Sequence, residues 1–133
     1  MKQADEGCAE FGIFNFEDGS RYYGSVNQTQ NVHGFGMWTD ASGSQLYEGQ
    51  LRNGAYHGRG RTIWVDGEVY CGNYVENRKS GFGKETYASG DSYAGSFLND
   101  KKHGKGIYQC KNGATYTGEF KDGKRHGFGT ATL

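Results

Sequence analysis

Apolar and polar positions alternate in short stretches along the chain. In "YEGQL", at 47–51, the tyrosine, glycine and leucine share one parity, and Glu48 and Gln50 share the other. This period of two predicts a β-strand with one buried face. A second stretch in each unit places the two glycines of a G-x-G motif in parity with a large ring, such as Trp64 or Tyr87. Because no stretch shows helical periodicity with capping residues, the sequence predicts an all-β protein.

The alternation belongs to a repeat of 23 residues. Each unit begins with a tyrosine, has glycine two residues later and an apolar side chain four residues later, and continues through a polar segment, the G-x-G pair and a turn glycine. The leading residues are Tyr22, Tyr47, Tyr70, Tyr93 and Tyr116, and only the first interval is longer, at 25 residues. The repeat accounts for 21 of the 24 glycines. A nucleotide-binding glycine loop is therefore not needed to explain them, and each G-x-G leads into a strand rather than a helix.

The array is predicted to span residues 12–133. It opens with a half repeat over 12–21, because "GIFNFEDGSRYYG" superposes without gaps on "GIYQCKNGATYTG" at 106–118. Residues 1–11 are expected to be an N-terminal extension or a degenerate cap. No cap is visible at Leu133, so truncation or end-to-end association is expected.

Each unit is predicted to form two short strands joined by a polar loop. The links "EDG", "VDG", "ASG" and "KNG" between units are predicted hairpin turns with glycine at positive φ. Hairpins that pair edge to edge build an elongated, twisted antiparallel sheet, a solenoid-like array of stacked β-hairpins. Glycine inside such strands leaves room for a neighbouring ring to lie over the backbone.

The composition agrees with a folded protein whose buried mass is aromatic. The chain has 20 aromatic residues against 12 valines, isoleucines and leucines. Its 15 basic and 15 acidic residues balance, which gives no support for a nucleic-acid partner. The three cysteines lack CxxC spacing, and no signal peptide or membrane-spanning run is visible. We expect a cytoplasmic protein, or one peripheral to a membrane or the cytoskeleton.

The recurring Y-x-G-x-aromatic, polar loop, G-x-G, aromatic and turn glycine resemble the MORN (membrane occupation and recognition nexus) repeat over 12–133. Departures are local: Ser80 replaces a His- or Asn-like residue, and Asp40 replaces an aromatic one. The resemblance implies a scaffold that binds extended or helical partner segments and forms homodimers. The resemblance also implies that such arrays occur as accessory modules beside lipid-kinase, methyltransferase, junctional-membrane and ciliary domains. The interpretation of this chain as a regulatory module of a larger enzyme therefore stays open.

Four histidines occupy one repeat position, just before the G-x-G pair: His33, His57, His103 and His126. Units about 9–10 Å apart cannot bring two imidazoles onto one metal ion, so we predict that these side chains hydrogen-bond the loop. Ser, His and Asp occur only at repeated positions, without a singular constellation. The sequence therefore predicts no metal, no cofactor, no catalytic residues and no enzyme activity.

Two surfaces are candidates for function. A lone sheet leaves rings available on its aromatic face, and we expect that face to bind a protein partner, either a peptide segment or a second copy. The rings expected to bind are Trp64, Tyr74, Tyr87, Phe97 and Phe120.

The alternative surface is a row of basic loops at one edge of the predicted sheet. Such loops attract anionic or phosphoinositide lipids, by about 1 kcal/mol for each well-placed basic side chain. Charged loops also serve solubility and blunt sheet edges, so this second explanation stays open. The residues concerned are Arg78, Lys79, Lys101, Lys102, Lys124 and Arg125.

Overall fold

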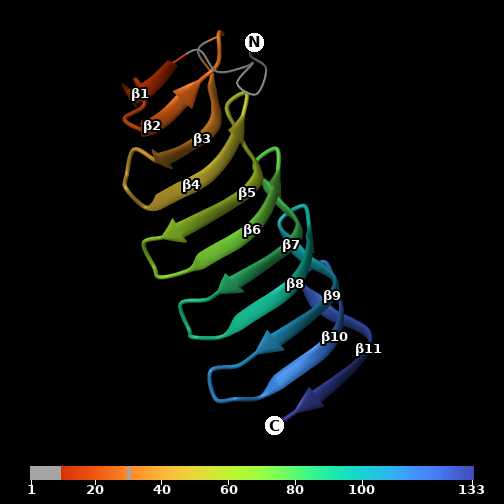
Figure 1. Ribbon diagram of the computed structural model, residues 1–133. Helices are drawn as coiled ribbons and strands as arrows, with labels where there is room; N and C mark the ends of the chain where they lie inside the picture. Colours follow the sequence, from red (N-terminus) through yellow and green to blue (C-terminus); the bar gives the residue numbers. More distant parts are fainter. Residues whose placement is uncertain (1–9, 30) are drawn as a thin grey trace.

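Eleven strands form a single antiparallel sheet in the computed structural model, which describes residues 10–29 and 31–133. The strands are β1 (Glu10–Asn15), β2 (Arg21–Val26), β3 (Val32–Thr39), β4 (Gln45–Arg52), β5 (Ala55–Trp64), β6 (Val69–Val75), β7 (Arg78–Thr86), β8 (Ser92–Leu98), β9 (Lys101–Gln109), β10 (Thr115–Lys121) and β11 (Lys124–Thr132). Their order in the sheet is their order in the chain, with β1 and β11 at opposite ends (Figure 1). The predicted all-β array of stacked hairpins is confirmed.

The first strand repeats the register of the later ones. Gly12 faces Gly24 in the β1–β2 pair, just as Gly106 faces Gly118 in the β9–β10 pair. β1 begins at Glu10, two residues before the start expected for the half repeat. The expected cap falls mostly on residues 1–9, which lie outside the described residues.

The hairpin turns gather along two edges of the sheet. At one edge each link between units contains a glycine with positive φ, as predicted: Gly19, Gly43, Gly67, Gly90 and Gly113. At the other edge the predicted polar loops are wrong for the last four units. Two-residue turns stand there, with both residues at positive φ, as at Glu76 and Asn77. This geometry matches the twist of the flanking strands, so β7 begins directly after the turn, at Arg78.

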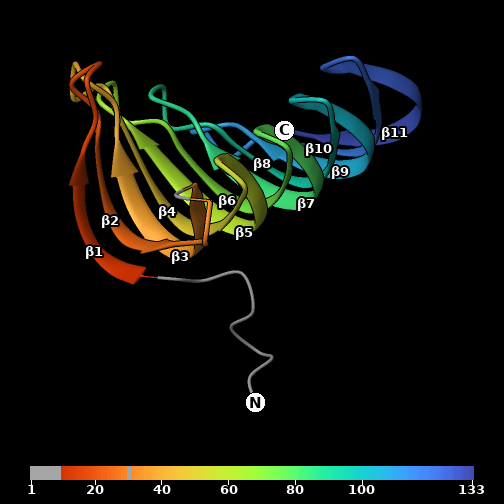
Figure 2. The same cartoon turned by 90° about the horizontal axis from the view of Figure 1, so that it is seen from above.

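The sheet is strongly curved. A register shift follows the first glycine of every unit, for example between Gly72 and Tyr74, and such bulges bend a strand. Figure 2 shows both edges of the sheet rising toward the same side. We call the face that carries the leading tyrosines the inner face, and the opposite face the outer face.

The core lies on the inner face and is built from two residues of each unit. Its members are Tyr22, Val26, Tyr47, Leu51, Tyr70, Tyr74, Tyr93, Phe97, Tyr116 and Phe120. Rings interlock edge to face within and between units: the Tyr93 centroid lies 5.1 Å from that of Phe97 in its own unit and 5.0 Å from that of Phe120 in the next. Each unit therefore buries its rings against its neighbour, as in a solenoid.

The tyrosine and the glycines of a unit form one packing motif. The Tyr93 hydroxyl donates a 2.8 Å hydrogen bond to the Ser96 carbonyl at the bulge. The Tyr93 ring lies over Gly106, where an added Cβ would come closer than 3.0 Å to the hydroxyl oxygen and two ring carbons. The prediction that glycine makes room for a ring is confirmed, and the hydroxyl explains why the ring belongs to tyrosine rather than phenylalanine.

Candidate interaction surface

A second set of rings packs on the core and stays half-exposed along the inner face. Trp64 and Tyr87 are two of the rings predicted to bind a partner, and the structure places both here. Three further rings of this set were not among those predicted to bind a partner: Trp38, Tyr56 and Tyr108. Their signal in the sequence was parity with the G-x-G glycines of their own strands. In the sheet they lie opposite Tyr22, Leu51 and Tyr93.

The other three rings predicted to bind a partner lie in the core. Tyr74, Phe97 and Phe120 are each 4% exposed, so they are not available as a binding surface in the folded array. The Phe97 ring, for example, is enclosed by Tyr93 and by Tyr70 of the preceding unit, with centroids at 5.1 and 5.2 Å. The bulge turns this position under the neighbouring ring, which a period of two cannot show.

The six basic residues predicted for the loops are the first two residues of strands β7, β9 and β11. The loop placement was therefore wrong, and alternation along the strands sends the six side chains to different places. Three are exposed at the sheet edge: Arg78, Lys101 and Lys124. Three sit opposite core rings in the sheet: Lys79, Lys102 and Arg125.

The three inner-face cations lie over aromatic rings. Lys79 Nζ is 5.1 Å from the centroid of Trp64, and Lys102 Nζ is 5.6 Å from that of Tyr87. The Arg125 guanidinium is 4.5 Å from the ring of Tyr116. These are cation–π distances, so the last three units place their own cations on the inner rings.

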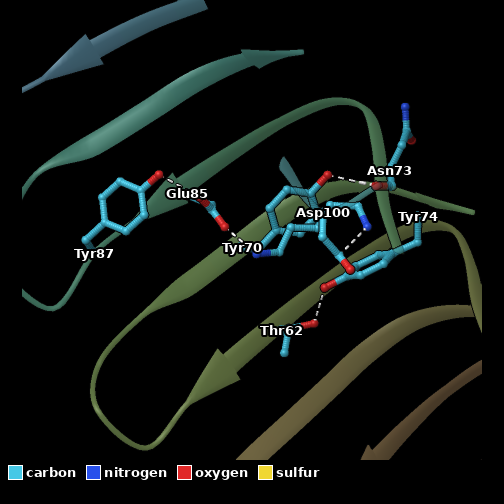
Figure 3. A network of polar contacts seen from close by, with 8 residues as sticks. Thr62, Tyr70, Asn73, Tyr74, Glu85, Tyr87 and Asp100 are labelled. Atoms are coloured by element: carbon cyan, nitrogen blue, oxygen red, sulfur yellow. Dashed lines mark hydrogen bonds and ion pairs between the residues drawn. The ribbon is translucent and has the colours of Figure 1, made fainter. Parts of the chain in front are cut away.

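Lys79 also belongs to a buried polar network between β7 and its turn. Its ammonium pairs with the Glu85 carboxylate, and the two side chains are only 14% and 11% exposed. The Tyr87 hydroxyl donates to the second carboxylate oxygen at 2.6 Å (Figure 3). Burial raises the pKa of Tyr87, and the adjacent Glu85 carboxylate raises it further, so the phenol remains protonated and donates. Lys79 was predicted from the sequence as a loop residue, and its pairing with Glu85 was not predicted.

Two of the histidines hydrogen-bond a turn, as predicted, but the turn is not that of their own unit. The His33 imidazole Nδ1 accepts from the Asn53 amide at 3.1 Å, and the His57 Nδ1 accepts from the Glu76 amide at 3.2 Å. Both amides belong to the turn of the following unit, so these histidines fasten one unit to the next. Within residues 10–29 and 31–133, no group of three or more His, Cys, Asp or Glu could hold a metal ion.

The inner face is hollowed at its N-terminal end. A pocket of about 550 Å³ is lined by residues that include Phe16, Asp18, Trp38 and Tyr56. Its wall comes from both edges of the sheet, because Asp18 lies in a turn at one edge and Asn77 in a turn at the other. The inner face is therefore concave.

The outer face also exposes rings, which the sequence analysis did not select. The middle residue of G-x-G alternates along the array between phenylalanine and a basic residue: Phe35, Arg59, Phe82, Lys105 and Phe128. Phe82 is 69% exposed and Phe128 91% exposed, and a shallow groove of about 490 Å³ lies between them. The signal was present in the sequence, but the prediction used only the parity of the glycines.

Comparison with known families agrees with this geometry. The MORN repeat model matches four consecutive segments, 47–69, 70–92, 93–115 and 116–133, which begin at four of the five leading tyrosines. No curated protein matches the chain. Among the described residues no helix is long and apolar enough to cross a membrane. MORN repeats are generally interaction or membrane-binding modules. The four matched repeats cover more than half of the sequence, and the chain belongs to the MORN repeat family.

Proposed function

We propose that this chain is a non-catalytic scaffold that binds a segment of a partner protein along its inner face. The observation that carries the proposal is the row of half-exposed rings held in place by a fully packed core. The Tyr56 ring, for example, stacks on Tyr47 at 3.7 Å between centroids and meets Trp38 at 6.1 Å. Rigid rings lose little conformational entropy on binding, and they dominate the energy of protein interfaces.

The shape of the surface favours a protruding segment as the ligand. The edges curl over the concave inner face, and such a hollow accepts an extended or helical stretch more readily than a flat surface. Two carboxylates at the inner face already have structural partners: Asp91 accepts from the Tyr108 hydroxyl at 2.9 Å, and Glu85 pairs with Lys79. Free thiols at Cys71 and Cys110 are consistent with the proposed cytoplasmic location.

Selection of binders from a displayed peptide library tests this proposal. We expect the folded variants Trp64→Ser and Tyr108→Ser each to bind the selected peptides with an affinity lower by about tenfold or more. Truncating an interface hot spot costs at least 1–2 kcal/mol of binding free energy. Phe82→Ser and Phe128→Ser on the outer face are the matched controls, and circular dichroism checks folding. Peptides that bind the inner-face variants with unchanged affinity and require the outer-face phenylalanines would refute the inner-face site. A dimer formed without peptide, and dissociated by the inner-face changes, would identify a second copy as the ligand.

A second candidate function is attachment to anionic or phosphoinositide membranes. Two observations favour it. The exposed residues Arg78, Lys101 and Lys124 recur at one edge of the sheet, and the outer face alternates exposed phenylalanines with basic residues. Acidic turn residues lie beside that edge, at Glu76, Asp100 and Asp122, and reduce its positive charge. The inner-face cations are less suited to lipid, because they already cover rings.

Vesicle co-sedimentation separates this candidate from the first. If the edge binds lipid, the combined variant Arg78→Glu, Lys101→Glu and Lys124→Glu should abolish sedimentation with phosphatidylserine or phosphoinositide vesicles at physiological salt. Each basic side chain contributes about 1 kcal/mol at an anionic surface, and reversing its charge also adds repulsion. A Phe82→Ser, Phe128→Ser variant measures the contribution of the outer face. Failure of the unmodified chain to sediment under these conditions would eliminate membrane attachment.

A further inference from the structure

We propose that the pocket at the N-terminal end of the inner face receives a lysine or arginine side chain of the partner segment. The inference rests on the proposed function, because it assigns the chemistry of one subsite on the surface that is proposed to bind the partner. The pocket is the one of about 550 Å³ lined by Phe16, Asp18, Trp38 and Tyr56.

The walls of the pocket are fixed aromatic rings. Trp38 and Tyr56 meet at 68° between ring planes and so form a corner. Tyr56 is held by its stack on Tyr47, whose plane is tilted by only 6°, and by a 2.9 Å hydrogen bond from the Gln45 side-chain amide to its hydroxyl. Several preorganised rings around one space make a favourable site for an organic cation.

A carboxylate completes the pocket. Asp18 Oδ1 accepts both the Ser20 amide, at 2.8 Å, and the Ser20 hydroxyl, at 2.6 Å. These bonds lower the pKa of Asp18, so it is ionised at neutral pH, and they fix the carboxylate at the pocket wall. None of the described residues that line the pocket is basic. The charge of the lining is therefore negative, and a cation is the complementary ligand.

The later units of the array place cations of their own on this face. One position in each unit follows the edge turn and lies opposite the second core residue of that unit. In the last three units that position holds a cation, which lies over the rings: Lys79, Lys102 and Arg125. In the first two units it holds Val32 and Tyr56, so the ring pocket there has no cation from its own unit. A partner side chain would supply the group that the later units provide for themselves.

The test uses small probes and the complete chain. N-acetyl-lysine N-methylamide and N-acetyl-arginine N-methylamide are titrated at constant ionic strength, beside an isostere with methyl in place of the lysine ammonium. The indole N–H resonances of Trp38 and Trp64 are followed by NMR. We expect a saturable shift of Trp38 with both cations and none with the isostere. Trp64 should not respond, because Lys79 already lies over it.

Asp18→Asn tests the carboxylate without disturbing the turn. Asparagine keeps the oxygen that caps the turn, and Asn112 makes the same type of turn bond in a later unit, to the Ala114 amide at 2.9 Å. We expect this change to lower the affinity for the lysine probe by about two- to fivefold, the range for an exposed ion pair. Asp66→Asn is the matched control, because Asp66 caps the equivalent turn through the Glu68 amide and does not line the pocket.

Two results would overturn the inference: an isostere that shifts Trp38 as strongly as the lysine probe, or an Asp18→Asn variant that binds the lysine probe unchanged. The outcome is independent of the peptide selection. If the pocket binds the cation probes but no selected peptide requires the inner face, this inference is supported and the proposed function is refuted. If selected peptides require the inner face but the pocket does not bind the cation probes, only the cation site is refuted.

Discussion

Replacing Gly106 with alanine should lower the free energy of unfolding by about 2–3 kcal/mol, the upper part of the range for overpacking a tightly packed site. The added Cβ would lie closer than 3.0 Å to the Tyr93 hydroxyl and two of its ring carbons, so the ring would have to move. That movement would weaken the 2.8 Å bond from the Tyr93 hydroxyl to the Ser96 carbonyl and loosen contacts with Phe97.

The chain contains a matched control for this substitution. Gly12 occupies the same repeat position in the opening half repeat, and an added Cβ there meets no atom within 4 Å. Gly12→Ala should therefore change the free energy of unfolding by less than about 1 kcal/mol, because only the strand preference of the residue changes. Urea unfolding followed by circular dichroism measures both variants. Equal losses at the two sites would contradict the ring-over-glycine account of the repeat.

Replacing Lys79 with methionine should destabilise the array by about 3 kcal/mol, since breaking one side of a buried ion pair leaves an uncompensated charge. Glu85 would keep the Tyr87 hydroxyl as a donor but lose the ammonium. Both charged side chains are less than one-sixth exposed, so water cannot replace the lost partner well. Urea unfolding of the single variant gives the cost directly.

The preceding unit suggests how to repair the loss. There the two positions are Tyr56 and Thr62, and the Thr62 hydroxyl bonds Tyr74 at 2.5 Å. The next unit has Phe97 at the position of Tyr74, which offers no hydroxyl, so valine rather than threonine suits the second position. We expect the double variant Lys79→Tyr, Glu85→Val to unfold within about 1 kcal/mol of the original chain, since a well-packed apolar pair often replaces a buried ion pair at little cost.

Adding the single variants Lys79→Tyr and Glu85→Val closes a double-mutant cycle, which isolates the coupling between the two side chains. A Lys79→Met variant as stable as the original chain would show that Glu85 is adequately solvated or protonated. A double variant destabilised by the sum of both single changes would show that packing, rather than charge pairing, governs this position.

The sequence by itself determined the architecture. The recurring tyrosine, the paired glycines and the turn glycines each impose a local geometry, and the same geometry repeated every 23 residues leaves few ways to stack. The half repeat at Gly12 could be recognised because its register follows from the same spacing. Two of the rings predicted to bind, Trp64 and Tyr87, also lie where parity placed them.

Only the tertiary structure decided which side chains remain available for binding. Alternation assigns a residue to a face, but burial depends on the bulge that turns Phe97 and Phe120 under the rings of neighbouring units. The two-residue turns likewise depend on pairing between strands, and they moved Lys102 from an expected loop onto the inner rings. The concave pocket beside Trp38 exists because both edges of the curved sheet contribute to one wall. Curvature accumulates over many strands, and a local pattern of residues does not contain it.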